Sequence, residues 1–413
     1  MNILLCGHAC GPGLGSEPGL TWNWAWYLSQ KHRVWAVVHP EYRVQIEAFL
    51  ATHPNDNLTF IWASLPRAID PWDPAKGESG LRLHYLIWQR IVLGRATELL
   101  NRINFDVCHY VSWATVHSTP LLWKLPLPFF WGPIGGGQTA PLAFREYLGP
   151  NWWKEAARNL RVSMRALSPS LRQAIRNSAL ILVTNNDTRR LLEAAGAHSD
   201  DISLFLADGL SHDSLAAAPI EHDARSEIVL HWSGRLEVNK GLPLALEALA
   251  KTVDHTNLPI RMEISGDGPE RAFYERLALK FAISDRVLFL GRISRSEVLL
   301  RLRDADGLLF TSLRDSFGSV CLEAMAQGLP VIVLNHQGVR DFIPEEASWK
   351  IELTSPSETL TRLASAIREM AINRNARVDR GRAALAFARS QLWPRRVERM
   401  EVLYEQYRHH ANR

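Results

Sequence analysis

The segment from Leu308 to Val333 constrains the fold of this 413-residue chain more than any other stretch. It begins as a short apolar strand, breaks at Thr311-Ser312, crosses an irregular loop and starts a helix near Val320. Gly328-Leu329-Pro330 then turns the chain into a second apolar strand. Strand, helix and strand in this order predict a βαβ unit of a parallel sheet, and such units bind ligands at the carboxyl ends of their strands.

The loop of this unit carries two acids, Asp315 before the helix and Glu323 one turn inside it, with Phe317-Gly318-Ser319 between them. A helix that follows a small-residue loop offers unpaired backbone N–H groups and the positive end of its dipole, which suits a phosphate. An ordinary surface loop with a charged edge is the alternative interpretation.

Residues 315–332, D-S-F-G-S-V-C-L-E-A-M-A-Q-G-L-P-V-I, resemble the acid-x7-acid signature of the retaining glycosyltransferases of family 4, which have the GT-B fold. The resemblance implies that Asp315 contacts hydroxyls of the donor sugar and that Glu323 holds the ribose of the nucleotide. Asp315 is one methylene shorter than the Glu usual in the family. The residues implied to bind the donor around the helix start are Phe317, Gly318, Ser319 and Val320.

A second motif follows the apolar run at 228–232, where G-R-L-E-V-N-K-G precedes a helix predicted from Leu242 to Lys251. Two fixed cations at the end of a strand can stabilise a departing diphosphate without a metal. The motif resembles the family's diphosphate clamp, which implies that Gly234, Arg235 and Lys240 face the donor phosphates.

Two further turns of the C-terminal half resemble the family pattern. Residues 266–270 read G-D-G-P-E, and the resemblance places Gly266 and Asp267 beside the nucleotide. A strand predicted at 286–290 ends in Gly291-Arg292-Ile293, and the backbone of Ile293 is implied to meet the base.

The N-terminal half begins with a strand, Asn2 to Gly7, and a glycine-rich loop at 8–19. Such a loop lets the backbone approach a phosphate closely, although the glycine spacing does not fit the dinucleotide-binding fingerprint. The G-S-E-P-G stretch resembles a subset of the family, which implies that Gly13 and Gly15 face the diphosphate and that Glu17 lies toward the acceptor.

Other candidates follow the predicted strands at 105–111 and 127–131. The family often ends the first of these with D-x-x-H-x-H; His109 matches the first histidine, whereas Val111 replaces the second. His109 is therefore a catalytic candidate, with a structural strand-end histidine as the alternative. Tight turns are the alternative for the glycines among the acceptor-side candidates, which are Trp113, His117, Gly135 and Gly136.

Composition excludes several classes of protein. Apolar residues make up 46% and charged residues 22% of the chain, which is typical of a globular protein. A net charge of +4 is mild and argues against a nucleic-acid partner. The four cysteines lie in apolar runs without C-x-x-C spacing, so we expect reduced, buried thiols and no metal site. We expect no secretory signal and no spanning helix, hence a cytoplasmic location.

Residues 144–177 contain seven Arg or Lys and two acids, with Trp152, Trp153 and Leu160 among the basic residues. This is typical of an amphipathic helix on an anionic membrane, with an ordinary solvated helix face as the alternative. Because related transferases commonly use lipid-linked acceptors, we expect peripheral contact with the inner face of the cytoplasmic membrane.

Taken over the whole chain, the resemblance implies an α/β protein with the GT-B fold: two facing Rossmann-like domains, a deep interdomain cleft and a C-terminal helix that crosses back to the first domain. The expected domains are 1–215 for the acceptor, 216–388 for the nucleotide sugar, and 389–413 for the returning helix, predicted from Trp393 to Tyr407.

The implied reaction is metal-independent, cofactor-free transfer of a hexosyl unit, with retained anomeric configuration, from a UDP- or GDP-type sugar to a glycan or lipid-linked acceptor. Cell-surface polysaccharide or glycolipid synthesis is the expected setting. A sugar-nucleotide epimerase, a phosphorylase and a non-catalytic nucleotide-sugar-binding protein are the alternatives.

Overall fold

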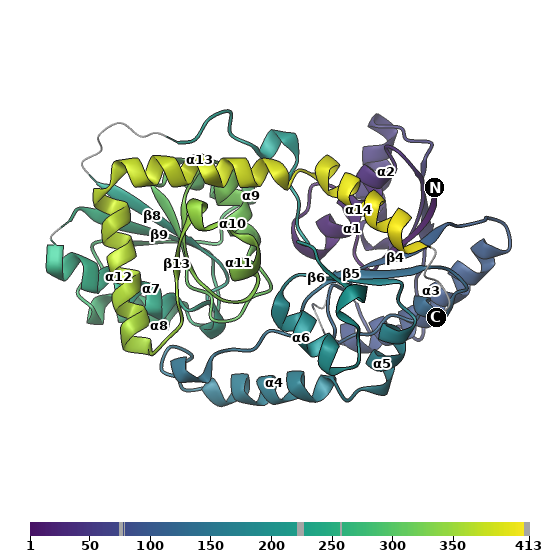
Figure 1. Cartoon of the computed structure of the whole chain (residues 1–413), viewed down its shortest axis with the longest axis horizontal. Coiled ribbons are helices and arrows are strands. Elements are labelled where there is room, and N and C mark those ends of the chain that lie inside the picture. The colour runs from purple at the N-terminus through teal and green to yellow at the C-terminus, as the bar shows by residue number, and fades with distance from the viewer. Residues whose placement is uncertain (74–76, 78, 221–226, 257, 409–413) are drawn as a thin grey trace. The chain divides into compact units, whose positions relative to one another are not determined.

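The computed structural model describes residues 1–73, 77, 79–220, 227–256 and 258–408 (Figure 1). It separates into two compact units. The first comprises Met1–Gly137, Val162–Gly209 and Trp393–Arg413, and the second comprises Gln138–Arg161 and Leu210–Leu392.

These bounds differ from the predicted domains at one important place. Residues 138–161 were expected within the first domain, 1–215, but they pack in the second unit. The reason is apolar burial, because Phe144, Tyr147 and Leu148 belong to the same buried core cluster as Leu246. The helical segment predicted at 144–177 is therefore divided between the two units.

The first unit is built on a seven-stranded parallel sheet with the order β3-β2-β1-β4-β5-β6-β7. The strands are short apolar runs, as expected for parallel strands that are covered on both faces. They are β1 (Asn2–Gly7), β2 (Arg33–Val38), β3 (Leu58–Trp62), β4 (Val107–Ser112), β5 (Phe129–Ile134), β6 (Leu180–Val183) and β7 (Ile202–Leu204).

Two apolar clusters cover the faces of this sheet. Helices α3, α5 and α6 contribute to one cluster, and α1, α2 and α14 contribute to the other. The helices are α1 (Ser16–Leu28), α2 (Arg43–Thr52), α3 (Leu81–Leu100), α5 (Pro169–Arg176), α6 (Asn186–Ala194) and α14 (Trp393–Tyr407).

The last helix, α14, has the predicted bounds and packs against α1 of the first unit. Trp393, Val397, Met400 and Tyr404 recur every three or four residues, so they share one face of the helix. All four are buried. The Tyr404 hydroxyl lies 2.5 Å from His109 Nδ1, which links the helix to β4.

The second unit is built on a six-stranded parallel sheet with the order β10-β9-β8-β11-β12-β13. The predicted βαβ unit at its centre is confirmed by β11, α10 and β12. The strands are β8 (Ile228–Ser233), β9 (Ile260–Ser265), β10 (Val287–Gly291), β11 (Gly307–Phe310), β12 (Val331–Leu334) and β13 (Ser348–Ile351).

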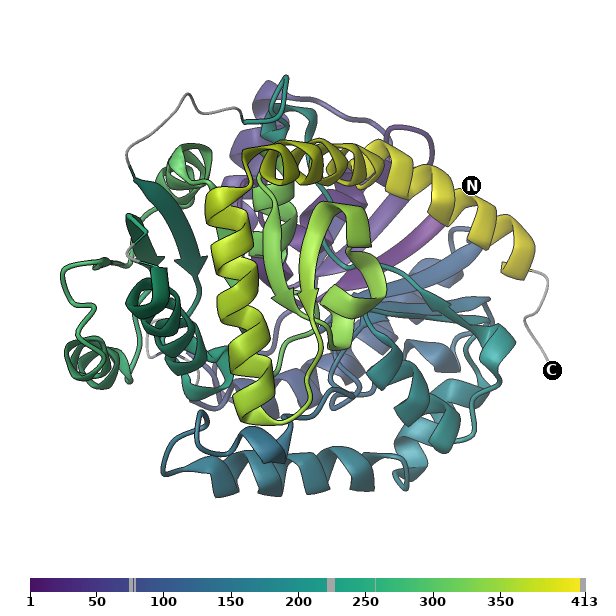
Figure 2. The ribbon, with the colours of Figure 1, turned by 60° about the vertical axis from the view of Figure 1, so that its left-hand side comes forward.

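Helices pack against this sheet and against one another; α12 lies beside α7 and against β12 and β13 (Figure 2), and α10 contacts α13. The helices are α7 (Leu242–Thr256), α8 (Arg271–Lys280), α9 (Arg295–Asp304), α10 (Ser319–Ala326), α11 (Gln337–Phe342), α12 (Pro356–Ile372) and α13 (Arg374–Ser390). A further helix, α4 (Trp152–Arg165), begins in this unit, whereas its last four residues belong to the first.

The prediction of reduced, buried thiols is met. All four cysteines are buried and unpaired. Among the helices in the described part of the chain, none is both long and apolar enough to cross a membrane.

Candidate active site

A cavity of about 430 Å³ lies at the carboxyl ends of β8 and β11 in the second unit. This is the edge of a parallel sheet at which ligands bind in α/β proteins. The structure brings most of the predicted donor-site residues together there. Its lining includes Gly234, Arg235, Lys240, Ile293, Asp315, Gly318, Ser319, Val320 and Glu323.

Lys240 and Asp315 form a close ion pair in the cavity, with 2.6 Å between Lys240 Nζ and Asp315 Oδ2. Lys240 ends a short 3-10 turn, Val238–Lys240, and Gly241 follows with φ 65°. A Cβ at Gly241 would lie 2.1 Å from the Thr311 carbonyl oxygen, so this turn packs tightly against the end of β11. Backbone packing thus holds the turn after Lys240, and the ion pair with Asp315 holds its ammonium in the cavity.

Arg235 differs from Lys240 because its side chain is 74% exposed. Its Nη2 lies 2.8 Å from Glu237 Oε1, a pair in high-dielectric surroundings that water and salt screen strongly. The guanidinium can therefore exchange Glu237 for a phosphate at little cost.

The start of α10 forms another wall of the cavity. Gly318 precedes the helix with φ 91°, and a Cβ there would lie 2.4 Å from the Phe310 ring. Only glycine fits both constraints. No side chain caps the first amides of α10, and Gly318, Ser319 and Val320 line the cavity. Unpaired amides and the helix dipole thus favour an anion at this point.

Glu323 lies one turn further along α10 and is held by Arg295, which belongs to none of the sequence motifs. Arg295 Nε and Nη2 lie 3.0 and 2.9 Å from Glu323 Oε1. A ribose that binds Glu323 would share the carboxylate with this guanidinium. The available signal for Arg295 was its position at the start of the helix that follows the Ile293 turn.

Three predicted donor residues of the second unit do not line the cavity. The Phe317 ring is buried and packs edge-on against Phe342, so the expected donor contact is corrected to a packing role. Gly266 and Asp267 support the neighbouring loop instead. Gly266, at φ 133°, closely approaches the Gly234 carbonyl, and the Asp267 carbonyl accepts from Leu236 N at 3.1 Å.

His109 was a catalytic candidate, with a structural strand-end histidine as the alternative, and its contacts favour the structural alternative. It is fully buried in the first unit; Nδ1 meets the Tyr404 hydroxyl and Nε2 lies 2.7 Å from the Gly132 carbonyl oxygen. Burial lowers the pKa of His109 to about 4. With both nitrogens engaged and no access to solvent, the imidazole has the contacts of a structural histidine.

Glu17, at the start of α1, is an acceptor-side candidate that lies beside the end of β4. The Ser112 hydroxyl donates to Oε2 at 2.5 Å, and the Ala114 amide donates to Oε1 at 3.1 Å. Burial raises the pKa of the Glu17 carboxyl, and the two hydrogen bonds only partly oppose it. Trp113 follows Ser112 in the chain, and its ring stacks on the Tyr85 ring with 4.1 Å between the ring centroids.

The glycines of the first unit fall into two kinds. A Cβ at Gly13 or Gly15 would have no neighbour within 4 Å, so packing does not explain them. Gly136, at φ 102°, is a tight turn in which a Cβ would lie 2.8 Å from Thr115 Oγ1, and its carbonyl contacts His117 Nε2 at 3.0 Å. Gly135 pairs through its backbone with Ala114 and Val116. The tight-turn alternative therefore accounts for Gly136, whose turn His117 contacts, whereas Gly135 pairs with Thr115 in a parallel bridge.

Two comparisons show what the cavity-bearing segment and the fold are similar to. Residues 218–386 match the family model described as glycosyl transferases group 1, and this segment contains every residue of the cavity lining. The two Rossmann-like parallel sheets match those of glycosyltransferases with the GT-B fold. The predicted fold class is thereby confirmed.

Particular proteins of this class resemble the chain to different extents. A glycosyltransferase from Rickettsia africae and sucrose-phosphate synthase from Thermosynechococcus elongatus superpose with TM-scores of 0.64 and 0.66, at 15% and 17% identity, over 98% of each chain. The Anabaena protein HepE, solved with UDP and glucose, gives a TM-score of 0.61 at 15% identity over 98% of this chain and 99% of its own. At these identities the likeness shows the fold.

Sequence similarity to curated proteins is confined to shorter segments. N-acetyl-alpha-D-glucosaminyl L-malate synthase of Bacillus anthracis is 37% identical over 117 residues, which are 28% of this chain and 29% of that protein. An uncharacterized glycosyltransferase of Methanocaldococcus jannaschii is 30% identical over 122 residues, 30% of this chain and 31% of its own. The aligned segments thus span less than half of these relatives.

Proposed function

We propose that this protein is a retaining glycosyltransferase that moves a hexosyl unit from a nucleoside-diphosphate sugar of the UDP or GDP type to a glycan or lipid-linked acceptor. The observation that carries the proposal is the convergence of Lys240, Asp315, Glu323 and the first amides of α10 on one cavity. The match of residues 218–386 to glycosyl transferases group 1 supports it. The similarly folded HepE, solved with UDP and glucose, supports a UDP-type donor.

In the proposed reaction the bond between the anomeric carbon and the β-phosphate oxygen breaks, and a bond to the acceptor oxygen forms on the same face. The acceptor proton passes to the leaving phosphate oxygen. Negative charge grows on the diphosphate, so Lys240, Arg235 and the α10 amides stabilise the transition state more than the ground state. Asp315 orients the sugar and Glu323 binds the ribose.

We propose that the first unit binds the acceptor and that the reaction needs no cofactor or metal. In the described part of the chain no group of three or more His, Cys, Asp or Glu is arranged to hold a metal ion. The assay that tests the function offers UDP-, GDP- and ADP-hexoses with lipid extracts and free glycans as acceptors, with and without chelator.

We expect acceptor-dependent release of one nucleoside diphosphate, unchanged by the chelator. Donor turnover without any acceptor would instead indicate an epimerase. Binding of a nucleotide sugar with no turnover under any condition would indicate a non-catalytic binding protein.

A second part of the proposal concerns the outer face of α4. Trp153, Leu160 and Met164 lie seven and four residues apart, hence on one side of the helix, and are 56%, 63% and 58% exposed. Lys154 and Arg161 are exposed beside them, whereas the single acid of α4, Glu155, is buried. An apolar stripe flanked by cations with no exposed carboxylate complements an anionic lipid surface. We therefore propose peripheral binding to the cytoplasmic face of a membrane, in keeping with cell-surface polysaccharide or glycolipid synthesis.

Replacing Trp153 and Leu160 together with alanine should weaken binding to vesicles that contain anionic phospholipid on the order of 10²-fold, since each large side chain contributes roughly 1.5–3 kcal/mol when fully buried. Vesicle co-sedimentation measures the effect. Leu279→Ala with Leu300→Ala removes two exposed leucines from α8 and α9 and is the matched control. Equal binding by both variants, or binding indifferent to lipid charge, would exclude this surface.

A further inference from the structure

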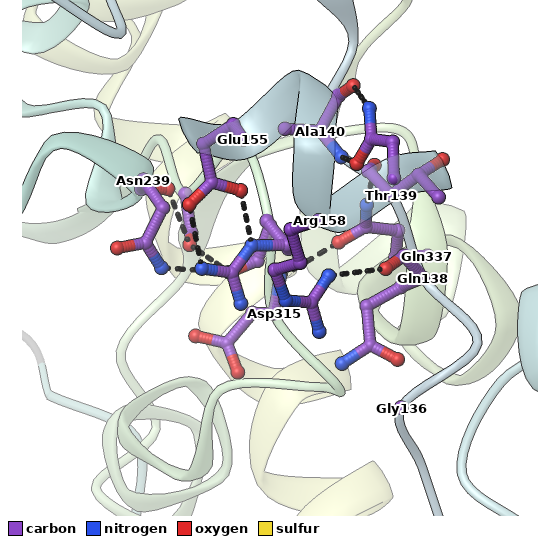
Figure 3. A network of polar contacts seen from close by, with 12 residues as sticks. Gly136, Gln138, Thr139, Ala140, Glu155, Arg158, Asn239, Asp315 and Gln337 are labelled. Atoms are coloured by element: carbon purple, nitrogen blue, oxygen red, sulfur yellow. Dashed lines mark hydrogen bonds and ion pairs between the residues drawn. The ribbon is translucent and has the colours of Figure 1, made fainter. Parts of the chain in front are cut away.

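The loop that carries Asp315 is held by a segment remote from it in sequence (Figure 3). Arg314 donates from Nε and Nη2 to Glu155 of α4, at 2.7 and 2.9 Å. The two side chains are only 20% and 12% exposed. A bidentate guanidinium–carboxylate pair fixes orientation as well as distance, and losing one partner of a half-buried pair is costly.

The same segment contacts the residues on the other side of Arg314. Gln138 Nε2 donates to Ser316 Oγ at 3.0 Å. Gln337 accepts from the Asp315 amide at 2.7 Å through Oε1, and its Nε2 donates to the Thr139 carbonyl at 2.8 Å. Residues 314, 315 and 316 are thus each tied, directly or through one amide side chain, to residues 138–155.

This segment is itself internally braced, so it can act as a fixed support. Arg158 donates to the Gln138 carbonyl at 3.0 Å, and the Asn159 side chain bonds both the amide and the carbonyl of Ala140, at 3.1 and 2.8 Å. Burial and the neighbouring Arg314 lower the pKa of Arg158 to about 10. Glu155 faces both guanidinium groups and is the anion that balances them.

Gln337 shows how tightly the loop is specified. It is buried and adopts φ 56°, a left-handed conformation that non-glycine residues rarely occupy. Such a conformation persists only where the surroundings determine it. The side-chain amide of Gln337 bridges Asp315 and Thr139, and this bridge is a physical reason for a glutamine at position 337.

Resting on the proposed function, we infer that Glu155, with Gln138 and Gln337, is a positioning residue that sets where Asp315 meets the donor hexose. Glu155 touches neither donor nor acceptor in this scheme; it acts through Arg314. A misplacement of about 1 Å in an orienting group can cost on the order of 10²-fold in rate, so loss of this support should reduce transfer without weakening the nucleotide end of the site.

The test compares the wild type with Glu155→Gln, which removes the charge but keeps the shape. Hydrogen exchange in the peptide covering 312–318 should become about tenfold faster, while exchange over α12 stays unchanged. The affinity of a nucleoside-diphosphate hexose should fall about tenfold. The affinity of the nucleoside diphosphate without its hexose should stay unchanged. The double variant Glu155→Arg with Arg314→Glu should restore both. Glu358→Gln, which breaks the exposed Glu358–Arg362 pair on α12, is the control.

Unchanged exchange over 312–318 in Glu155→Gln would overturn the inference. A parallel loss of affinity for both ligands would also overturn it, since Glu155 would then be only structural. Gln138→Ala gives an independent check through Ser316, with faster loop exchange expected and unchanged exchange counting against the inference. If the wild type binds no nucleotide sugar, the proposed function fails, and the exchange measurement alone still decides whether Glu155 orders the loop.

Discussion

Replacing Lys240 with alanine should lower the transfer rate on the order of 10²-fold, because a fixed donor to a developing anion contributes about 2–4 kcal/mol to transition-state stabilisation. The ammonium also lies 2.6 Å from Asp315, so its removal leaves that carboxylate without its cation. The effect should fall mainly on kcat, since charge on the diphosphate grows as the glycosidic bond breaks. Steady-state assays over donor concentration separate kcat from KM.

Lys251 supplies the matched control. It lies on α7, its Nζ donates to Thr361 Oγ1 at 2.8 Å, and it is absent from the cavity lining. Lys251→Ala should therefore retain the wild-type rate. Equal rates for Lys240→Ala and Lys251→Ala would remove Lys240 from the diphosphate site, whatever the cavity contains.

Replacing Tyr404 with alanine should lower the free energy of unfolding of the first unit by about 3–5 kcal/mol. The side chain is fully buried, packs edge-on against Phe130 at 4.9 Å, and contacts His109 through its hydroxyl. Removing the ring leaves a cavity and an unpaired His109 Nδ1 in the core. Denaturant unfolding followed by tryptophan fluorescence gives the change.

Two further variants separate the contributions at this position. Tyr404→Phe keeps the ring and should cost roughly 1–3 kcal/mol, the penalty for an unsatisfied buried nitrogen. Tyr407→Ala removes a less buried tyrosine of the same helix, whose hydroxyl donates to the Asp200 carbonyl at 2.8 Å, and should cost less than Tyr404→Ala. A Tyr404→Ala protein as stable as the Tyr407→Ala protein would show that α14 contributes little to the first unit.

Local patterns predicted the fold well. The strand, loop, helix and strand predicted at 308–333 appear as β11, α10 and β12. They could be predicted because apolar runs and a glycine turn are local patterns that span only a few residues. The helix from Trp393 to Tyr407 has the predicted bounds for the same reason, a clear apolar face. The predicted donor residues that come directly after strands also line one cavity, because parallel strands place their carboxyl ends at one edge of the sheet.

What the sequence could not predict depends on contacts between distant residues. Glu155 pairs with Arg314 across 159 positions, and Gln337 reaches Thr139 across 198. No local pattern specifies such partners. A related reason explains two other misses. A motif gives the identity of a side chain but not its direction or its neighbours, so it could not show that Phe317 packs against Phe342 or that both His109 nitrogens are hydrogen-bonded.

The two sides of α4 have a thermodynamic consequence. Leu160 lies on one side of the helix and Glu155 on the other, so a surface that favours the helix in its Arg314-bound arrangement also favours an ordered Asp315 loop. If α4 binds a membrane through its outer side and Asp315 meets the donor as proposed, linkage is reciprocal, and a donor sugar that tightens the loop must raise the affinity of the helix for that surface by the same factor. The fraction of protein attached to a lipid surface would then report how much donor the cell supplies.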